Sequence, residues 1–249
     1  MSVVDVAADR ARPGTLVSFL ALYRLLLRMQ ITVTRLLGIA GLGALAVLIG
    51  LFSRWDDNPA QAAADVVSSY GLGILVPFAA LWLGTSAIGD LVDDRLLVYL
   101  WLKPVARWQL PGAAVLATVS VVLPLTAVPL AAAALVAGAG EVAPAAFLAG
   151  SLAAFAYAGL FVAAGIAFRR AVWWGLAFVL VWENVVAHTA EGAARFTVRG
   201  WAASVLDLAP DVGVSDTAGS AGAAIVVLVA IAVAGWLVAT WRYRRADVD

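Results

Sequence analysis

Six long apolar stretches occupy most of this sequence and leave few folds open to it. They cover residues 36–53, 69–89, 112–136, 145–168, 172–188 and 220–241. A helix of about 20 apolar residues crosses the hydrocarbon core of a bilayer. Because backbone polar groups cannot stay unpaired in lipid, we expect each stretch to be helical. The sequence therefore predicts an all-α integral membrane protein with six transmembrane helices, of which the fifth is the shortest and most polar.

The composition supports a membrane protein and excludes several kinds of site. Of the 249 residues, 64% are hydrophobic and 13% are charged, whereas a soluble protein carries about 25% charged residues. There is no cysteine and only one histidine, which excludes disulfides, thiolate catalysis and metal sites built from cysteine or several histidines. The net charge is zero and no basic tract indicates nucleic acid binding. No linker divides the chain, so we expect one transmembrane domain over 1–249.

The basic residues predict the orientation, because loops on the cytoplasmic side carry an excess of arginine and lysine. With the N-terminus inside, thirteen of the 16 basic residues are cytoplasmic, and Arg54, Arg195 and Arg199 are the three outside. Both ends are therefore expected in the cytoplasm. Arginine far outnumbers lysine, a bias typical of GC-rich bacterial genomes. We expect a multi-pass protein of the bacterial cytoplasmic (inner) membrane.

An amphipathic segment, residues 16–35, precedes the first apolar stretch. At 3.6 residues per turn, Arg24, Arg28 and Arg35 fall within an arc of about 40°, and leucines fill most of the rest. This pattern is typical of an interfacial helix whose arginines face lipid phosphates and water. The alternative is a seventh span that starts here, which the cost of placing arginine in mid-membrane disfavours.

The segment 189–219, between the fifth and sixth stretches, lies outside in this orientation. Its sequence VRGWAASVLDLA, residues 198–209, is too short to cross the membrane but apolar enough to enter the outer leaflet. We expect a short re-entrant or surface helix there, closed by Pro210.

No residues in the sequence form a recognisable catalytic site. There is no phosphate-binding loop of the G-x-x-x-x-G-K-[ST] type. Ser86 and His188 would lie near opposite ends of their spans, whereas a nucleophile and its base must lie about 3 Å apart. We therefore expect no enzyme activity, catalytic residue or metal site in this chain alone, and a membrane-embedded hydrolase is disfavoured.

The cytoplasmic segment 90–112 mixes charges with apolar and aromatic residues. On a helix starting at Asp90, the three aspartates Asp90, Asp93 and Asp94 lie within an arc of about 100°. Leu91, Leu96 and Leu100 lie outside this arc. Pro104 would end this helix, because a proline disfavours helical conformation in the residue before it. Two interpretations stay open: the helix presents its carboxylates to a cytosolic partner, or it only anchors the loop to the membrane.

Residues 88–117, IGDLVDDRLLVYLWLKPVARWQLPGAAVLA, resemble the segment after the second membrane helix of ABC-2-type ABC transporter permeases. That family shows a small residue, an acidic residue, an acidic-basic pair, leucines and a P-V-S-R sequence before the third helix. Asp90, the pair Asp94–Arg95 and the stretch Pro104–Arg107 occupy those places. The sequence departs from the pattern with aspartate for the usual glutamate, Ala106 for serine, and Ala113 for a common lysine.

The resemblance implies a permease subunit that forms the translocation pathway of an ATP-driven transporter. We expect this transporter to be an exporter. The resemblance also implies a coupling helix region, 90–110, that fits a groove on a separate ATPase subunit. The residues implied at this interface are Asp90, Asp93, Asp94, Arg95 and Arg107. ATP and Mg would bind the partner ATPase, and this chain would bind no cofactor. A second copy of the chain, or a related permease, would complete the transporter.

Two other functions stay open from the sequence: a secondary transporter driven by an ion gradient, and a membrane anchor without catalytic function. A secondary transporter is expected to have inverted repeats and charged groups near the bilayer midplane. The sequence shows no convincing repeat, and Glu183 is the one carboxylate within the six stretches.

Glu183 is a candidate site residue because a charge inside the membrane must face protein or a water-filled cavity. Asn184 and His188 share a helical face at positions i and i+4 and extend the polar character outward. Glu183 is interpreted either as part of an outer gate or substrate path, or as a structural acceptor. In the second case it would bind hydrogen-bond donors at the start of the re-entrant helix expected over 198–209.

Overall fold

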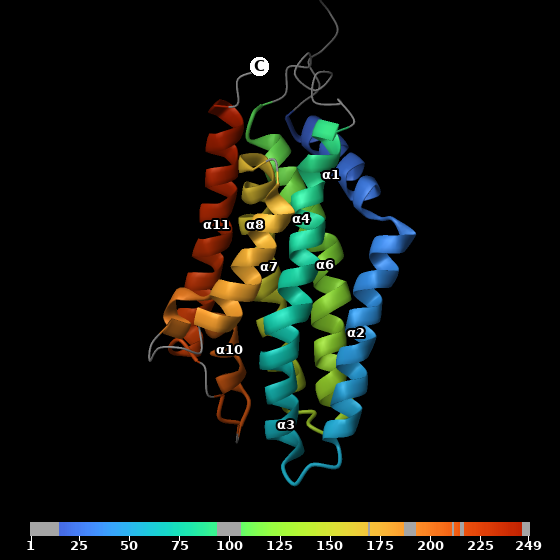
Figure 1. Cartoon of the computed structure of the whole chain (residues 1–249), viewed down its shortest axis with the longest axis vertical. Helices are drawn as coiled ribbons and strands as arrows, with labels where there is room; N and C mark the ends of the chain where they lie inside the picture. Colours follow the sequence, from blue (N-terminus) through green and yellow to red (C-terminus); the bar gives the residue numbers. More distant parts are fainter. Residues whose placement is uncertain are drawn as a thin grey trace, which may run out of the picture.

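The computed structural model describes residues 15–93, 106–168, 170–186, 193–210, 212–214 and 217–245, and these are helical with short connections (Figure 1). Among them, five helical segments are long and apolar enough to cross a membrane. These are α2 (Val33–Ser53), the continuous segment Pro59–Gly89, α6 (Gln109–Val136), α7 (Ala143–Ala167) and α11 (Ala221–Arg245). The all-helical class is thus confirmed, and the five segments indicate a multi-pass membrane protein.

The other elements are shorter or differ in helix type. The segment after α2 is built from α3 (Pro59–Asp65), a π-helix η1 (Val66–Leu75) and α4 (Val76–Asp93). The remaining elements are α1 (Thr15–Gln30), α8 (Ala171–Ala177), the π-helix η2 (Phe178–Val186), the 3₁₀ turns η3 (Ala193–Phe196) and η4 (Leu206–Leu208), and α10 (Val198–Ala203). Pro77 lies two residues after η1 ends. Because a proline cannot donate the hydrogen bond that an α-helix needs there, the helix type changes next to it.

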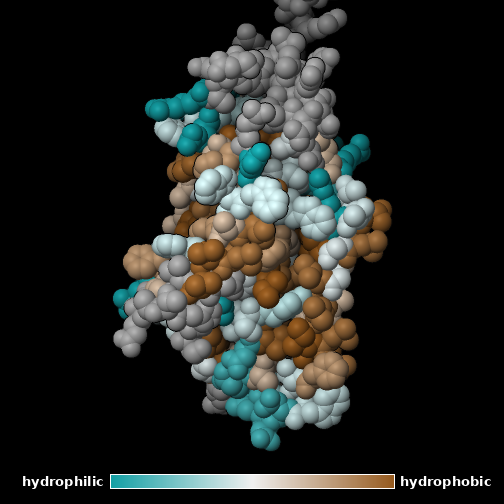
Figure 2. Space-filling view, viewed as in Figure 1, coloured by the Kyte–Doolittle hydropathy of each residue, from teal (hydrophilic) through white to brown (hydrophobic). Residues whose placement is uncertain are grey.

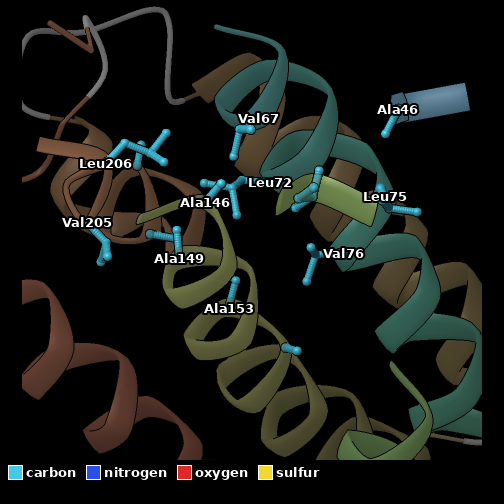
Figure 3. Packing of buried hydrophobic residues seen from close by; sticks show 14 of the residues in the cluster. Ala46, Val67, Leu72, Leu75, Val76, Ala146, Ala149, Ala153, Val205 and Leu206 are labelled. Atoms are coloured by element: carbon cyan, nitrogen blue, oxygen red, sulfur yellow. The ribbon is translucent and has the colours of Figure 1, made fainter. Parts of the chain in front are cut away.

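Helix α7 lies at the centre of the bundle and packs against α4, α6 and α11. Its buried face is mostly alanine, and Figure 3 shows Ala146 and Ala149 meeting side chains of η1 and of the segment after α10, such as Leu72 and Leu206. Small residues let helix backbones approach closely and so increase van der Waals contact. Such contact drives helix association in a membrane, where the hydrophobic effect does not. The alanines of α7 therefore allow the neighbouring helices to pack closely against it.

A very close helix contact is the crossing of α7 and α11 at two glycines. A Cβ atom on Gly235 would lie 2.5 Å from the carbonyl carbon of Gly159, and one on Gly159 would lie 2.7 Å from the Ala232 carbonyl oxygen. Both neighbours are backbone atoms, which no side-chain rotation can move aside. The crossing thus requires glycine on both helices.

The N-terminal amphipathic helix ends earlier than the sequence predicts. Helix α1 stops at Gln30, and Thr32 adopts an extended conformation (φ −112°, ψ 135°) before α2 begins at Val33. Consecutive β-branched residues have low helix propensity, which favours a break at this point. The prediction of one helix over 16–35 is therefore wrong at its end, and Arg35 belongs to the first turn of α2.

Within α1, the amphipathic pattern itself is confirmed. Leu22 and Leu26 are buried, whereas Arg24 and Arg28 lie on the more exposed side of the helix. The buried stripe packs on α6, where the Gln30 side-chain amide donates a 3.1 Å hydrogen bond to the Thr118 hydroxyl. In Figure 1, α1 lies at the same end of the bundle as the C-terminal end of α11.

The fifth apolar stretch forms a helix shorter than a full span. Elements α8 and η2 run together over 171–186, about 24 Å at 1.5 Å per residue, whereas the hydrocarbon core is about 30 Å thick. Of the six predicted spans, five are therefore long helices within the described residues, and the fifth, the shortest in the sequence, is present as a short apolar helix. A carboxylate, Glu183, lies near the end of the short helix.

The surface carries an apolar belt. Figure 2 shows hydrophobic residues across the middle of one face and hydrophilic residues gathered at its lower end. Large apolar side chains are exposed along α2 and α11, among them Leu37 and Leu48 on α2 and Val226 and Leu237 on α11. Exposed apolar surface of this extent is what a lipid-facing helix requires.

Candidate functional site

A buried carboxylate holds the start of the short helix α10. Glu183, on η2, is fully buried, and its two carboxylate oxygens each accept one backbone hydrogen bond at 3.0 Å. The donors are the N–H groups of Val198 and Arg199, the first residues of α10. The first N–H groups of a helix lack partners within the helix, and negative charge is stabilised there. Glu183 satisfies both conditions from outside the helix.

The rest of this helix start is also hydrogen-bonded. The Thr197 hydroxyl oxygen accepts from the Gly200 N–H at 3.0 Å, the usual N-cap contact. From η2, the Trp182 indole N–H donates to the Phe196 carbonyl at 3.0 Å. The segment that enters α10 is therefore fixed to η2 at two successive residues, Trp182 and Glu183.

An arginine connects the same helix to the other π-helix. Arg199 is only 7% exposed, and its Nε donates to the Ser68 carbonyl of η1 at 3.2 Å. At the start of η1, the Asp65 carbonyl accepts two side-chain hydrogen bonds, from the hydroxyls of Ser68 and Ser69. Helix α10 is thus hydrogen-bonded to η1 and to η2. Such π-helical segments are rare and frequently occur at functional sites.

Tyr157 of α7 completes the polar cluster inside the apolar core. Its side chain is fully buried, and its hydroxyl faces the Glu183 carboxylate without reaching full hydrogen-bond geometry. The Arg199 charge also lies close enough to interact with Glu183. A buried carboxylate is costly unless it is hydrogen-bonded and paired, and here the two N–H groups and the nearby cation reduce that cost.

The other end of α10 is tied to the entry of α11. The Ser204 hydroxyl donates to the Gly200 carbonyl at 3.0 Å and accepts from the N–H groups of Ala218 and Gly219 at 2.9 and 3.2 Å. Four elements therefore meet at one short helix: η1, η2, α7 and α11. This polar cluster (Ser68, Tyr157, Glu183, Thr197, Arg199 and Ser204) joins the four elements through α10. Among the described residues, no group of acidic or histidine side chains is placed to hold a metal.

The predicted residues of this site are only partly described. Glu183 accepts from the N–H groups at the start of the predicted re-entrant helix, 198–209, which is the contact that the structural interpretation requires. The side chain of Asn184 and the whole of His188 lie outside the described residues. The predicted short helix is present as α10 with η4, and the helical turns end before Pro210. The sequence reasoning missed Arg199 and Tyr157. Thr197 ahead of an apolar helix was a usable N-cap signal.

The predicted coupling segment is described only at its two ends. Asp90 and Asp93 lie in the last turn of α4, which continues past the predicted span end at residue 89. Their side chains, together with Asp94 and Arg95, lie outside the described residues. Arg107 is exposed, and its guanidinium donates to the Arg244 carbonyl at 2.8 Å, which links the start of α6 to the end of α11.

No known family model matches the chain, and no curated protein matches its sequence. Function therefore has to be inferred from the residues and their geometry.

Proposed function

We propose that this chain is the membrane-spanning permease subunit of an ABC-2-type ABC transporter, an exporter that works with a separate ATPase. One observation carries the proposal: the family-like segment 88–117 spans the end of the second long apolar helix and the start of the third. Helix α4 ends at Asp93 and α6 begins at Gln109, so the motif falls at the bundle end where a cytosolic ATPase would bind.

Three architectural features support this proposal. The amphipathic helix α1, with Arg24 and Arg28 on its outer side, precedes the first long helix. The short apolar helix 171–186 and the buried helix α10 come before the last long helix. If 171–186 is a sixth crossing completed by the segment around α10, both ends of the chain lie on one side. The arginines at the end of α11 are then cytoplasmic, as the positive-inside rule requires.

The polar cluster suggests how ATPase motion reaches the outer half of the bundle. Helix α4 follows η1 without a break, so displacement of residues 90–103 moves η1 along with it. The Ser68 carbonyl of η1 holds Arg199, and Arg199 belongs to the helix whose first N–H groups Glu183 holds. In this mechanism the chain provides the pathway and the lever, and the partner ATPase provides hydrolysis.

Co-expression with an ATPase encoded beside this chain, carrying a Walker A motif, tests the proposal. We expect the two proteins to co-purify in detergent and the complex to hydrolyse ATP. The secondary-transporter alternative makes the opposite prediction: the chain alone, in liposomes, moves its substrate when only an ion gradient is imposed. The ABC assignment would be rejected if the two proteins did not co-purify and the isolated chain transported its substrate along an ion gradient.

The proposed topology predicts a labelling pattern in intact cells. The natural chain has no cysteine, so single cysteines report without background. Cysteines replacing Ser2 and Asp247 are expected to react only after the inner membrane is opened. Cysteines replacing Asn58 and Asp216 should react with a membrane-impermeant maleimide from outside. External labelling at residue 98, in the coupling segment, would invert the arrangement and contradict the proposal.

Charge reversal in the coupling segment should weaken ATPase binding. We expect Asp93→Lys with Asp94→Lys to cost about 2–5 kcal/mol of association free energy, the range for buried paired charges at an interface. The matched control is Asp56→Lys with Asp57→Lys, a second adjacent pair, which lies in the loop at the opposite end of the bundle and is exposed. Binding measured by co-purification should fall only in the first variant. Equal binding by both variants would reduce the segment to a membrane anchor.

A further inference from the structure

A groove of about 310 Å³ lies between α1, α6, α7 and α11, apart from the polar cluster. Its walls are apolar and largely aromatic, formed by Phe19, Trp108, Val115, Phe155, Val233 and Trp236. The rings of Phe19 and Trp108 stack with centroids 5.9 Å apart, which joins α1 to the start of α6. These walls suit a hydrocarbon chain, and they offer few polar groups to a small hydrophilic solute.

One polar group in this wall is left without an acceptor. The Trp236 indole lies against Gly112, where a Cβ atom would be 3.2 Å from its Nε1. This buried N–H has no hydrogen-bond acceptor among the described residues. An unpaired buried donor is energetically unfavourable. A ligand that brings a carbonyl oxygen into the groove, as a glycerolipid ester does, would remove that cost.

The end of the groove nearest the C-terminal end of α11 is basic. Arg107 precedes the wall residue Trp108, and its guanidinium donates to the Arg244 carbonyl. Arg244 lies eight residues beyond Trp236, about 12 Å further along α11 and turned from it by about 80°. Both arginines are exposed. Arg245 is placed differently, because its guanidinium stacks 4.2 Å from the centre of the Trp241 ring.

We propose that this groove binds one anionic phospholipid from the leaflet on the arginine-rich side of the membrane. An acyl chain lies along the aromatic wall, and the phosphate lies between the guanidinium groups of Arg107 and Arg244. Charge complementarity selects an anionic headgroup, since basic pockets between membrane helices on the cytoplasmic side bind such lipids. The bound lipid bridges α1, α6 and α11. The inference needs only the membrane location of the chain, and it goes beyond the proposed ATPase partnership.

Native mass spectrometry of the full chain, delipidated in detergent, tests the proposal. We expect one dioleoyl-phosphatidylglycerol to be retained at least about tenfold more tightly than dioleoyl-phosphatidylcholine. Val233→Trp fills the groove and should abolish this retention. The matched control is Val226→Trp, one heptad earlier on the same face of α11 and outside the groove. Loss of retention in Val233→Trp but not in Val226→Trp supports the groove as the site.

The headgroup contact has its own controls. Arg107→Gln with Arg244→Gln should lower phosphatidylglycerol retention about tenfold, whereas Arg245→Gln should leave it unchanged. Soluble glycerol phosphate should not compete, because the acyl chain carries part of the affinity. Equal retention of the two lipids by the natural chain would overturn the proposal, and so would effective competition by glycerol phosphate. ATPase binding is measured separately, so failure here leaves the proposed function standing.

Discussion

Replacing Glu183 with alanine should destabilise the protein by about 3 kcal/mol or more. The change leaves two buried N–H groups at the start of α10 without their acceptors, and each such loss costs about 1–3 kcal/mol. It also removes the carboxylate that balances the buried charge of Arg199. Thermal unfolding in detergent should show a Tm about 6–12 °C lower, since 1 kcal/mol shifts Tm by about 2–4 °C in chains of this size.

Glutamine at position 183 should give an intermediate result. Its amide has one acceptor oxygen, whereas both carboxylate oxygens accept N–H groups in the natural protein. One N–H would therefore face an NH₂ group. The expected order of Tm is natural protein, Glu183→Gln, then Glu183→Ala. Glu141→Ala, at an exposed carboxylate in the α6–α7 turn, is the matched control and should be silent. A Glu183→Ala protein as stable as that control would exclude the structural role.

Leucine at position 235 should separate α7 from α11. The new side chain meets the Gly159 backbone at 2.5 Å, and overpacking of a tight contact typically costs about 1–3 kcal/mol and sometimes more. We expect a cost of about 3 kcal/mol, because neither backbone can move aside by rotating a side chain. The loss is measured as a lower Tm, together with faster proteolysis after Arg242 at the end of α11.

The control for this variant lies on the same helix. Gly222→Leu adds the same side chain to α11 at a position where a Cβ atom would have no neighbouring atom within 4 Å. Its Tm and its proteolysis rate should match those of the natural protein. Similar losses in both variants would show that leucine perturbs α11 itself, and that the glycine crossing is not the cause.

Hydropathy predicted the long helices well, because each must bury its backbone polar groups whatever its neighbours are. The predicted helix ends were wrong where local backbone or side-chain interactions, and not the length of the apolar stretch, determine where a helix stops. The break after Gln30 depends on Thr32 adopting an extended conformation, and an apolar count does not report that. The described part of the fifth stretch closes with a π-helix that contains Glu183, and no periodicity in the sequence distinguishes a π-helix from an α-helix over nine residues.

One residue of the polar cluster, Glu183, could be predicted from the sequence, whereas its contacts with the other residues could not. Glu183 stands out as a carboxylate in an apolar stretch, so burial against hydrogen-bond donors was a sound expectation. Arg199 and Ser68 are 131 positions apart, and sequence spacing gives no indication of such a contact. Gly159 and Ala163 form a pair of small residues four positions apart, a spacing that favours close helix packing. In an alanine-rich chain, however, such pairs recur by chance. Only the partner helix identifies this glycine as the contact.

ATP-driven transport in proteoliposomes tests the central claim most directly. Liposomes would contain this chain with its co-purified ATPase, and vesicles with the chain or the ATPase alone would serve as references. The account predicts that hydrolysis increases with transported substrate, and that Asp93→Lys with Asp94→Lys abolishes transport while the chain still inserts. Substrate movement by the chain alone, unaffected by ATP and driven by an ion gradient, would contradict the account.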